Sequence, residues 1–282
     1  MSGFAWARDP CRVCNPCNPC NPCNPCQSVA NDLLRSGDYA RKQIFCRSRV
    51  VAWSHGSRFE LARRLVRGRS GRLLDYGCGD GTFIAMVHDG FSEAVGVDVD
   101  ASQAMECTRR LGGLGNVRFS LTADVAAPSE RGRWDVVTCM EVLEHCLEHE
   151  RRRVLDDLAR LVSRSGMVLI SVPIEVGPSL LGKQFFRALA GLRKLGDYQH
   201  RERYTPVELL RAAAGGAVSR PAYEGVGAHG PYRYYGHKGF DFRDLEREIR
   251  MRLEIRERLF TPLSWLGPVL NSQVWFICAP LA

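Results

Sequence analysis

A short apolar segment that runs into three alternately spaced glycines constrains the fold of this chain more than any other feature. Residues 72–75 have the composition of a short buried strand, glycines stand at 77, 79 and 81, and residues 83–87 are apolar in a helix-like pattern. Glycine adopts backbone angles that other residues avoid, and it lets a ligand lie against the bare backbone. The pattern predicts a strand, a tight turn and a helix N-terminus, with a ligand bound at the turn.

The glycine spacing and the acid before it discriminate between ligands. Dinucleotide-binding enzymes use G-x-G-x-x-G, whereas this chain has G-x-G-x-G with Asp75 two residues before Gly77. A carboxylate at this point would repel a pyrophosphate, but it suits a ligand that carries an ammonium group. The loop therefore points to S-adenosylmethionine, and a nicotinamide-dependent oxidoreductase is kept as an alternative.

Acidic residues also end the next two apolar segments. Residues 94–98 and 117–125 have the composition of strands and carry Asp98 and Asp124 near their ends. The Asp98 carboxylate is suited to accept hydrogen bonds from two ribose hydroxyls, and that of Asp124 from an adenine amino group. Each acid can instead be the N-cap of the following helix, a position that Asp favours.

The chain continues to alternate between strands and helices after this point. Two more strands are predicted at residues 134–140 and 166–173, with a helix at 148–162 between them. This alternation predicts a parallel sheet with helices on both faces. Ligands of such sheets bind at the carboxyl ends of the strands, where the three acids fall.

Together these motifs resemble the class I S-adenosylmethionine-dependent methyltransferases, and among them the small-molecule enzymes similar to the ubiquinone-biosynthesis group. The resemblance rests on LLDYGCGDGTF at 73–83, GVDVD at 96–100, TADVAAP at 122–128, WDVVTCMEVLEH at 134–145 and GMVLISVP at 166–173. It implies an α/β fold with a doubly wound, mostly parallel seven-stranded sheet, and S-adenosyl-L-methionine as the cofactor.

The resemblance also implies which residues hold the cofactor. The glycine segment would bind the methionine moiety, the second acid the ribose and the third acid the adenine. The segment 141–145 after the fourth strand would line the methyl-donor site. The implied cofactor-binding residues are Asp75, Gly77, Cys78, Gly79, Gly81, Asp98, Val99, Asp124, Val125 and Glu141.

Composition limits the partners of this chain. At 282 residues with 45% hydrophobic residues, one domain with additions is expected. The net charge of +8 comes mostly from scattered arginines mixed with acids, which is typical of a solvated surface rather than a nucleic-acid interface. No apolar run approaches the about 20 residues of a transmembrane helix. Because the start also lacks a secretory signal pattern, we expect a cytoplasmic protein without an integral membrane segment.

A cysteine repeat sets residues 1–30 apart from the expected methyltransferase domain at 31–282. Six cysteines recur at every third residue from Cys11 to Cys26, mostly as Cys-Asn-Pro. Cys-x-x-Cys pairs bind zinc, so a metal site is one interpretation. In the extended chain that proline favours, however, the thiols are about 9 Å apart, too far to share an ion. We therefore favour a disordered, redox-sensitive tail and assign no metal ligands.

Segments on either side of the predicted sheet are expected to complete the site. Helices at 31–70 would cap the cofactor, and the side chains there that can face the site are Tyr39, Arg49 and His55. Substrate-side insertions are expected at 174–205 and 227–270.

Four elements are predicted in the C-terminal third. Thr205 and Pro206 form a helix start, and residues 222–226 form a sixth strand. A long charged helix is expected at 241–259, and residues 270–278 are expected to close the sheet as an antiparallel strand.

Methyl transfer from a sulfonium is an in-line displacement, so the acceptor atom must be held about 3 Å from the methyl carbon. An oxygen acceptor of high pKa also needs a base, most often histidine. His145, after the fourth strand, is the first candidate for this catalytic base, and His200 is the second. The sequence thus predicts O-methylation of a small molecule, a lipid precursor or a sugar. A non-enzymatic scaffold with the same fold is kept as an alternative, and the oligomeric state is not predicted.

Overall fold

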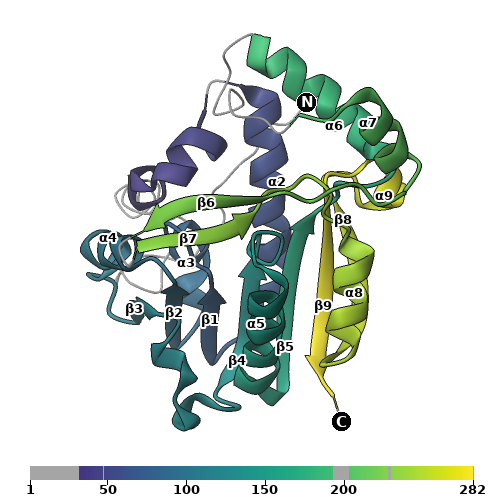
Figure 1. Ribbon diagram of the computed structural model, residues 1–282. Coiled ribbons are helices and arrows are strands. Elements are labelled where there is room, and N and C mark those ends of the chain that lie inside the picture. Colours follow the sequence, from purple (N-terminus) through teal and green to yellow (C-terminus); the bar gives the residue numbers. More distant parts are fainter. Residues whose placement is uncertain (1–31, 47, 193–202, 228–229, 282) are drawn as a thin grey trace.

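The computed structural model of this chain describes residues 32–46, 48–192, 203–227 and 230–281 (Figure 1). The cysteine repeat and the loop that carries His200 lie outside the described residues. Among the helices of the described part, none is both long and apolar enough to cross a membrane.

One sheet forms the centre of the described structure, with the strand order β3-β2-β1-β4-β5-β9-β8. Its strands are β1 (Arg72–Tyr76), β2 (Glu93–Asp98), β3 (Val117–Leu121), β4 (Trp134–Met140), β5 (Val162–Pro173), β8 (Leu253–Thr261) and β9 (Gln273–Pro280). The first five strands pair in parallel, whereas β9 is antiparallel to both β5 and β8. The predicted doubly wound, mostly parallel seven-stranded sheet is confirmed, and so is the antiparallel final strand.

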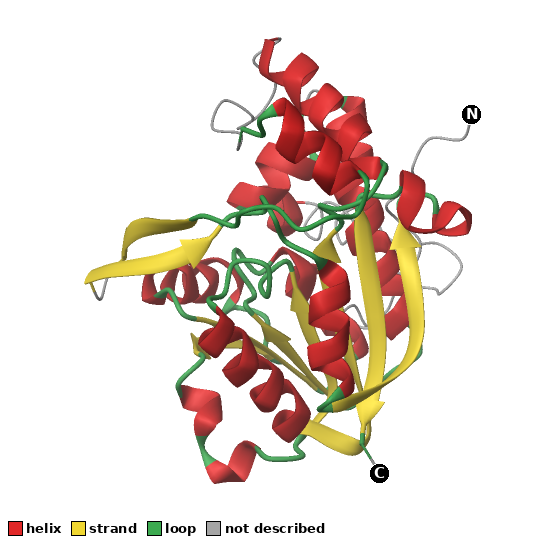
Figure 2. Ribbon diagram, turned by 45° about the vertical axis from the view of Figure 1, so that its right-hand side comes forward, coloured by secondary structure: helices red, strands yellow, loops and turns green. Residues whose placement is uncertain are grey.

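Helices cover both faces of this sheet (Figure 2). The helices of the described part of the chain include η1 (Ala40–Ile44), α2 (Arg49–Val66), α3 (Thr82–Val87), α4 (Ala101–Leu111), α5 (Glu148–Leu161), α6 (Ser179–Leu192), α7 (Pro206–Ala213), α8 (Phe242–Arg250) and α9 (Gly267–Leu270), of which α6 and α7 lie beyond the strand ends. Leu155 of α5 and Ile249 of α8 belong to the apolar core on one face. Phe59 of α2 and Leu111 of α4 belong to the core on the other. The central strands are buried on both sides, which explains their continuous apolar runs.

The predicted helix start at residues 205 and 206 is confirmed by its capping bonds. The Thr205 hydroxyl accepts a hydrogen bond from the Glu208 N–H at 3.2 Å, and the Glu208 carboxylate accepts from the Thr205 N–H at 2.8 Å. This reciprocal pair is a capping box, and Pro206 at the first helical position leaves no backbone N–H unsatisfied there.

In the C-terminal third, one prediction is confirmed with a pairing outside the main sheet, and another is wrong in its extent. Residues 222–226 do form a strand, β6 (Ala222–Gly227), but it pairs with β7 (Gly230–Tyr235) in a separate two-stranded hairpin. The helix predicted at 241–259 ends at Arg250, and β8 follows as the edge strand of the main sheet. An edge strand tolerates the charged residues of β8 because much of it faces solvent, so charge density alone does not identify a helix here.

The glycine turn between β1 and α3 is fixed by its backbone. The N–H groups of Gly77 and Cys78 both donate to the Val97 carbonyl of β2, at 2.7 and 3.0 Å. Gly77 and Gly79 have φ angles of 77° and 51°, in the left-handed region. A Cβ atom at Gly77 would lie 2.3 Å from Cγ2 of Val142, whereas a Cβ at Gly79 would meet nothing within 4 Å.

This difference predicts unequal costs for two alanine substitutions. Gly79→Ala should lower the free energy of unfolding by about 1–2 kcal/mol, because alanine is strained at positive φ. Gly77→Ala should cost about 2–5 kcal/mol, since overpacking against Val142 adds roughly 1–3 kcal/mol. Urea denaturation of both variants measures the difference, and equal losses would contradict the close approach to Val142.

Candidate active site

The second-strand acid holds the glycine turn in place. Oδ2 of Asp98 accepts a hydrogen bond from the Gly79 N–H at 2.9 Å, and Oδ1 accepts from the Asp100 N–H at 3.0 Å. The N-cap of α4 is Asp100, whose Oδ1 accepts from the Ser102 N–H at 2.8 Å. The N-cap alternative is therefore wrong for Asp98, and its carboxylate retains lone pairs for further donors such as ribose hydroxyls.

The first-strand acid is buried beneath the turn. Asp75 is 2% exposed, and its Oδ1 accepts a hydrogen bond from the Thr138 hydroxyl at 2.6 Å. Burial raises the pKa of Asp75 to about 7; the Thr138 hydrogen bond opposes this shift, and the nearby Asp98 and Asp80 carboxylates add to it. A carboxyl group with this pKa ionises readily when a cation binds beside it.

The third acid closes a turn after its strand. β3 ends at Leu121, and Asp124 is exposed at the start of a 3-10 turn, with its Oδ2 accepting from the Leu121 N–H at 3.0 Å. Val125 packs in the core at 4% exposure, while Val99, after β2, is 74% exposed. The contacts of these residues with the cofactor stay predictions.

Cys78 is held as a neutral thiol within the turn. Its Sγ donates to the Gly79 carbonyl at 3.8 Å, and Cys107 of α4 donates to the same carbonyl at 3.2 Å. The neighbouring Cys107 and burial raise the pKa of the Cys78 thiol far above its usual range. A thiol in this state is a poor nucleophile.

Asp80, which is not among the residues predicted for the site, joins the N-terminal segment to the glycine turn. Its Oδ2 accepts from the Tyr39 N–H at 2.8 Å, and its Oδ1 accepts from the Thr82 N–H at 3.1 Å. Arg110 of α4 also binds the Asp80 carbonyl. Gly81 is the N-cap of α3, and Asp80 before it accepts from the N–H two residues ahead, as in an Asx turn; Asp followed by Gly is a turn signal that could have identified this residue.

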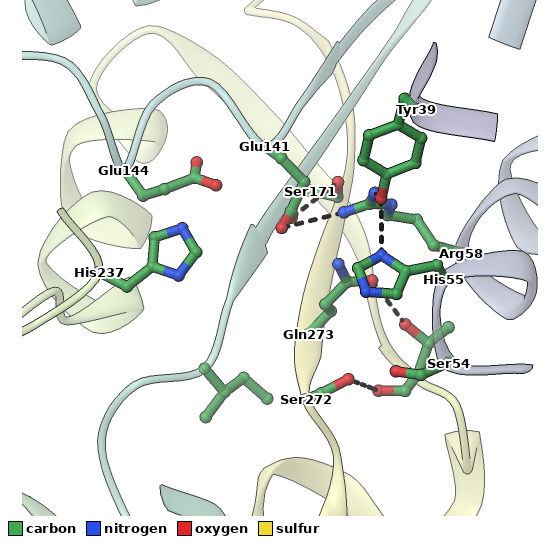
Figure 3. Close-up of polar contacts among 12 residues, drawn as sticks. Tyr39, Ser54, His55, Arg58, Glu141, Glu144, Ser171, His237, Ser272 and Gln273 are labelled. Atoms are coloured by element: carbon green, nitrogen blue, oxygen red, sulfur yellow. Dashed lines mark hydrogen bonds and ion pairs between the residues drawn. The ribbon is translucent and has the colours of Figure 1, made fainter. Parts of the chain in front are cut away.

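Glu141 adopts a backbone conformation that is rare for a residue with a side chain. It follows β4 directly and has a φ of 58°. Its N–H donates to the Ser171 carbonyl at 2.9 Å, and its carboxylate pairs with Nη1 of the buried Arg58 at 3.0 Å (Figure 3). The turn thus directs the predicted cofactor residue toward α2. Such strained residues are frequent at active sites.

A cavity of about 280 Å³ lies beside Glu141. Its lining comes from η1, α2, the segment after β4, the end of β5, α6, the segment after β7 and the start of β9. The lining residues are Gln43, Val51, Ser54, His55, Arg58, Glu141, Pro173, Lys183, Arg187, His237, Ser272 and Gln273. Most of them come from the segments at 31–70, 174–205 and 227–270 that were expected to complete the site, but no local pattern in the sequence indicates that these particular side chains meet at one cavity.

The charges around this cavity are arranged in pairs. Besides the pair of Arg58 with Glu141, the buried Glu175 carboxylate binds Lys183 at 2.6 Å and Arg187 at 2.9 Å. Burial opposes the ionisation of Glu175, but the two cations outweigh it and lower its pKa to about 2. Three cations thus face two carboxylates, which leaves one net positive charge.

His55 presents a neutral imidazole to the cavity. Its Nδ1 lies 2.6 Å from the Tyr39 hydroxyl, which Arg58 also contacts. Burial, followed by the positive charge of Arg58, lowers the pKa of His55 to about 3. Of the three residues expected to face the site, His55 lines the cavity, Tyr39 contacts His55, and the Arg49 side chain is exposed.

His145 does not line the cavity. Its Nδ1 lies 2.9 Å from the Tyr235 carbonyl oxygen, and its Nε2 lies 3.4 Å from Nε2 of His237, which does line the cavity. The catalytic role of His145 stays a prediction. The second candidate, His200, lies outside the described residues.

Comparison with known families identifies the fold and activity. Residues 52–215 match the sequence profile of a family described as a methyltransferase domain. The chain belongs to this methyltransferase family. The predictions of an S-adenosylmethionine-dependent methyltransferase and of S-adenosyl-L-methionine as its cofactor are confirmed, and the scaffold and oxidoreductase alternatives are set aside.

Sequence relatives of the methyltransferase include enzymes named ubiquinone biosynthesis O-methyltransferase. The protein from Methylococcus capsulatus is 30% identical over 177 residues, which cover 60% of this chain and 71% of the relative. The protein from Idiomarina loihiensis is 28% identical over 160 residues, which cover 55% of this chain and 64% of the relative.

Among solved structures, the PH0226 protein from Pyrococcus horikoshii has the same fold. Its TM-score is 0.53 at 17% sequence identity, and the match covers 80% of this chain and 91% of that protein.

The role of Asp98 can be tested by two substitutions that differ in what they retain. Asp98→Ala removes the acceptor for the Gly79 N–H and the predicted acceptor for the ribose, so we expect the Kd for S-adenosylmethionine to rise at least about 30-fold. Asp98→Asn keeps one acceptor oxygen, so its Kd for S-adenosylmethionine should lie between those of Asp98→Ala and the wild type. Titration calorimetry measures both values. An unchanged Kd for Asp98→Ala would refute the assignment.

The pKa of Asp75 predicts a pH-dependent affinity for the cofactor. Below about pH 7 the Asp75 carboxyl is neutral in the free protein, whereas the cofactor ammonium would favour its charged form. Binding then releases a proton, so the Kd should rise as the pH falls below 7, by at most about tenfold per unit. Calorimetry at several pH values between about 5.5 and about 8 should show this dependence of the Kd on pH in the wild type. Asp75→Asn should make the Kd nearly independent of pH over the same range. Parallel curves for the two proteins would exclude Asp75 as its source.

Proposed function

We propose that the methyltransferase transfers its methyl group to an oxygen atom of a small molecule, a lipid precursor or a sugar bound in the cavity beside Glu141. The observation that carries this proposal is the position of the cavity. Glu141 belongs to the segment that, by the family resemblance, lines the methyl-donor site, and it is also part of the cavity wall. An acceptor in the cavity would therefore lie next to the donated methyl group.

The size of the cavity favours a small acceptor or the reactive end of a larger one. Pockets for small molecules have volumes of roughly 300–1,000 Å³, and this cavity of about 280 Å³ is at the lower limit. It is suited to enclose one ring with its substituents. An extended lipid tail would have to remain outside.

The charge of the cavity favours oxygen as the methylated atom. An oxygen acceptor develops negative charge as it loses its proton, and the net positive charge formed by Arg58, Lys183 and Arg187 against Glu141 and Glu175 stabilises it. A positively charged amine would be disfavoured in the same place. The name of the relatives from Methylococcus capsulatus and Idiomarina loihiensis also supports oxygen.

His55 is better suited to orient a hydroxyl group than to remove its proton. An imidazole with a pKa of about 3 is a weak base at neutral pH, since the ideal base has a pKa near the working pH. Its ring is held by the Tyr39 hydroxyl, so a hydrogen bond from the acceptor would have a defined direction. Activation of the acceptor therefore requires a further group.

The proposal can be tested with S-adenosylmethionine that carries an isotopically labelled methyl group. The protein is incubated with this cofactor and a metabolite extract, and mass spectrometry identifies the compound that gains the label. We expect a methyl ether or ester. A labelled amine would overturn O-methylation, and so would the absence of any product when the cofactor is bound.

Substitution of His55 should separate orientation of the acceptor from binding of the donor. His55→Gln should lower kcat/KM for the acceptor by about 10- to 100-fold, because the hydroxyl loses its fixed partner. The Kd for S-adenosylmethionine should stay within about twofold. His88→Gln is the matched control, since His88 precedes β2 and contacts Asn116 instead of the cavity. Equal rates for the two variants would refute the role of His55.

A further inference from the structure

Arg58 brings a hydrogen-bond donor to the acceptor cavity that its neighbours do not use. Its side chain is buried, at 5% exposure, and lines the cavity. Nη1 pairs with Glu141 at 3.0 Å, and Nη2 contacts the Tyr39 hydroxyl (Figure 3). The buried Nε–H has no hydrogen-bond acceptor among the described residues. Because buried donors are almost always paired, this group indicates that a bound molecule supplies an oxygen here.

The charged groups around the cavity favour an anion as this molecule. The three cations that line the cavity and the two carboxylates paired with them are Arg58, Lys183, Arg187, Glu141 and Glu175. Together these five side chains carry one net positive charge. The nearby Glu144 does not line the cavity, and burial raises the pKa of its carboxyl well above its usual range, so it adds no full negative charge. An occupant with one negative charge would therefore balance the cavity.

Lys183 is held as a charged ammonium group. Its Nζ donates to the Glu175 carboxylate at 2.6 Å, to the Ile174 carbonyl at 3.0 Å and to the Ser272 carbonyl at 3.5 Å. Three acceptors require the three hydrogens of the ammonium form. Burial lowers the pKa of Lys183, but the attraction of Glu175 opposes this shift. While it makes these bonds, Lys183 contributes a positive charge and cannot accept a proton.

Among the described residues that line the cavity, none is suited to remove a proton from a hydroxyl group. Burial lowers the pKa of both His55 and His237 to about 3, so both imidazoles are weak bases at neutral pH. Glu141 is bound to Arg58 as a carboxylate, which is also a weak base. A hydroxyl acceptor would need a further group for its activation. An acceptor that is already ionised before it binds has no such requirement.

We propose that the acceptor is a carboxylic acid and that the protein methylates its ionised carboxylate to a methyl ester. This inference rests on the proposed function and narrows its substrate class. A carboxylate has one negative charge and two oxygens, one to accept the hydrogen bond from Nε of Arg58 and one to receive the methyl group. A phosphate monoester fits less well, because it carries close to two negative charges at neutral pH.

The methylation of a carboxylate needs no proton transfer. A lone pair of the carboxylate oxygen forms the bond to the methyl carbon, and the electrons of the carbon–sulfur bond return to sulfur. The products are the methyl ester and S-adenosylhomocysteine, so the negative charge of the acceptor and the positive charge of the sulfonium are both lost. A hydroxyl acceptor would instead release one proton for each methyl group transferred. The two kinds of acceptor therefore differ in a quantity that can be measured.

The test uses the full chain, S-adenosylmethionine with a radiolabelled methyl group and a metabolite extract freed of protein. Mild alkali hydrolyses methyl esters and releases the label as volatile methanol, whereas methyl ethers, methyl phosphates and methylated amines retain it. We expect most of the transferred label to become volatile. In a weakly buffered reaction with a pH indicator, we expect no release of protons. Incubations without the extract or without the protein give the background.

The chemical form of the label separates this inference from the proposed function. A label that alkali does not release, and that mass spectrometry assigns to a methyl ether or a methyl phosphate, would overturn the carboxylate acceptor and leave O-methylation intact. A methylated amine would overturn both proposals. The absence of any labelled product when S-adenosylmethionine is bound would also overturn both.

Two substitutions test whether the cations of the cavity bind the acid. Lys183→Met and Arg187→Met each remove one cation and leave the other paired with Glu175. Each should lower the initial rate of ester formation in dilute extract by about 10- to 100-fold, because the net positive charge is lost. The Kd for S-adenosylmethionine should stay within about twofold.

Arg63→Met is the matched control for these variants. Arg63 lies on α2 and pairs with Glu60, and neither residue lines the cavity. This variant should keep the wild-type rate of ester formation. Circular dichroism and the Kd for S-adenosylmethionine show whether each variant is folded. Wild-type rates for folded Lys183→Met and Arg187→Met would overturn the proposal.

Discussion

The hydrogen bonds that join the glycine turn to the end of β2 are the constraint on which the rest of the site depends. Gly77 and Cys78 share the Val97 carbonyl as acceptor, and the Asp98 carboxylate fixes Gly79. The turn so fixed leaves no space for a side chain between Gly77 and Val142. Since Val142 belongs to the segment after β4, the place of the donor also determines the place of Glu141, Glu144 and His145. One local arrangement of backbone N–H groups thereby positions both the cofactor-binding turn and the residues after β4.

Two separate contacts fasten the N-terminal segment over this arrangement. Asp80 binds the backbone of Tyr39, and Glu141 binds Arg58 of α2. The first contact reaches the segment from the glycine turn, and the second from the loop after β4. The segment before α2 is thus joined to the glycine turn through Tyr39, and α2, which carries His55, is joined to the loop after β4 through Arg58. The cavity forms where α2 and α6 face each other across the strand ends.

Much of the donor half could be predicted from the sequence because its determinants are local. The strand β1, its terminal acid and the following glycines occupy about ten adjacent residues. In the same way, Thr205 and Glu208 mark a helix start within four adjacent residues elsewhere in the chain. The acceptor half could not be predicted, because its determinants meet only in three dimensions. Lys183, Arg187 and His237 lie in the segments expected to be substrate-side insertions, but no local pattern indicates which side chains of these segments reach the cavity. The β8 strand was mistaken for helix since its charges resemble those of α8, and only its pairing with β9 distinguishes them.

The β6–β7 hairpin stands outside the main sheet, and a pair of bonds between Tyr235 and His145 joins its end to the core of the site. This arrangement divides the protein into two parts with different evolutionary freedom. Residues of β1, β2 and the glycine turn must stay complementary to one invariant cofactor. The hairpin and α6 contribute no strand to the main sheet, so they can change in length and composition without removing a hydrogen bond between its strands. Descendants of one ancestor can therefore acquire new acceptors while inheriting the same donor machinery intact.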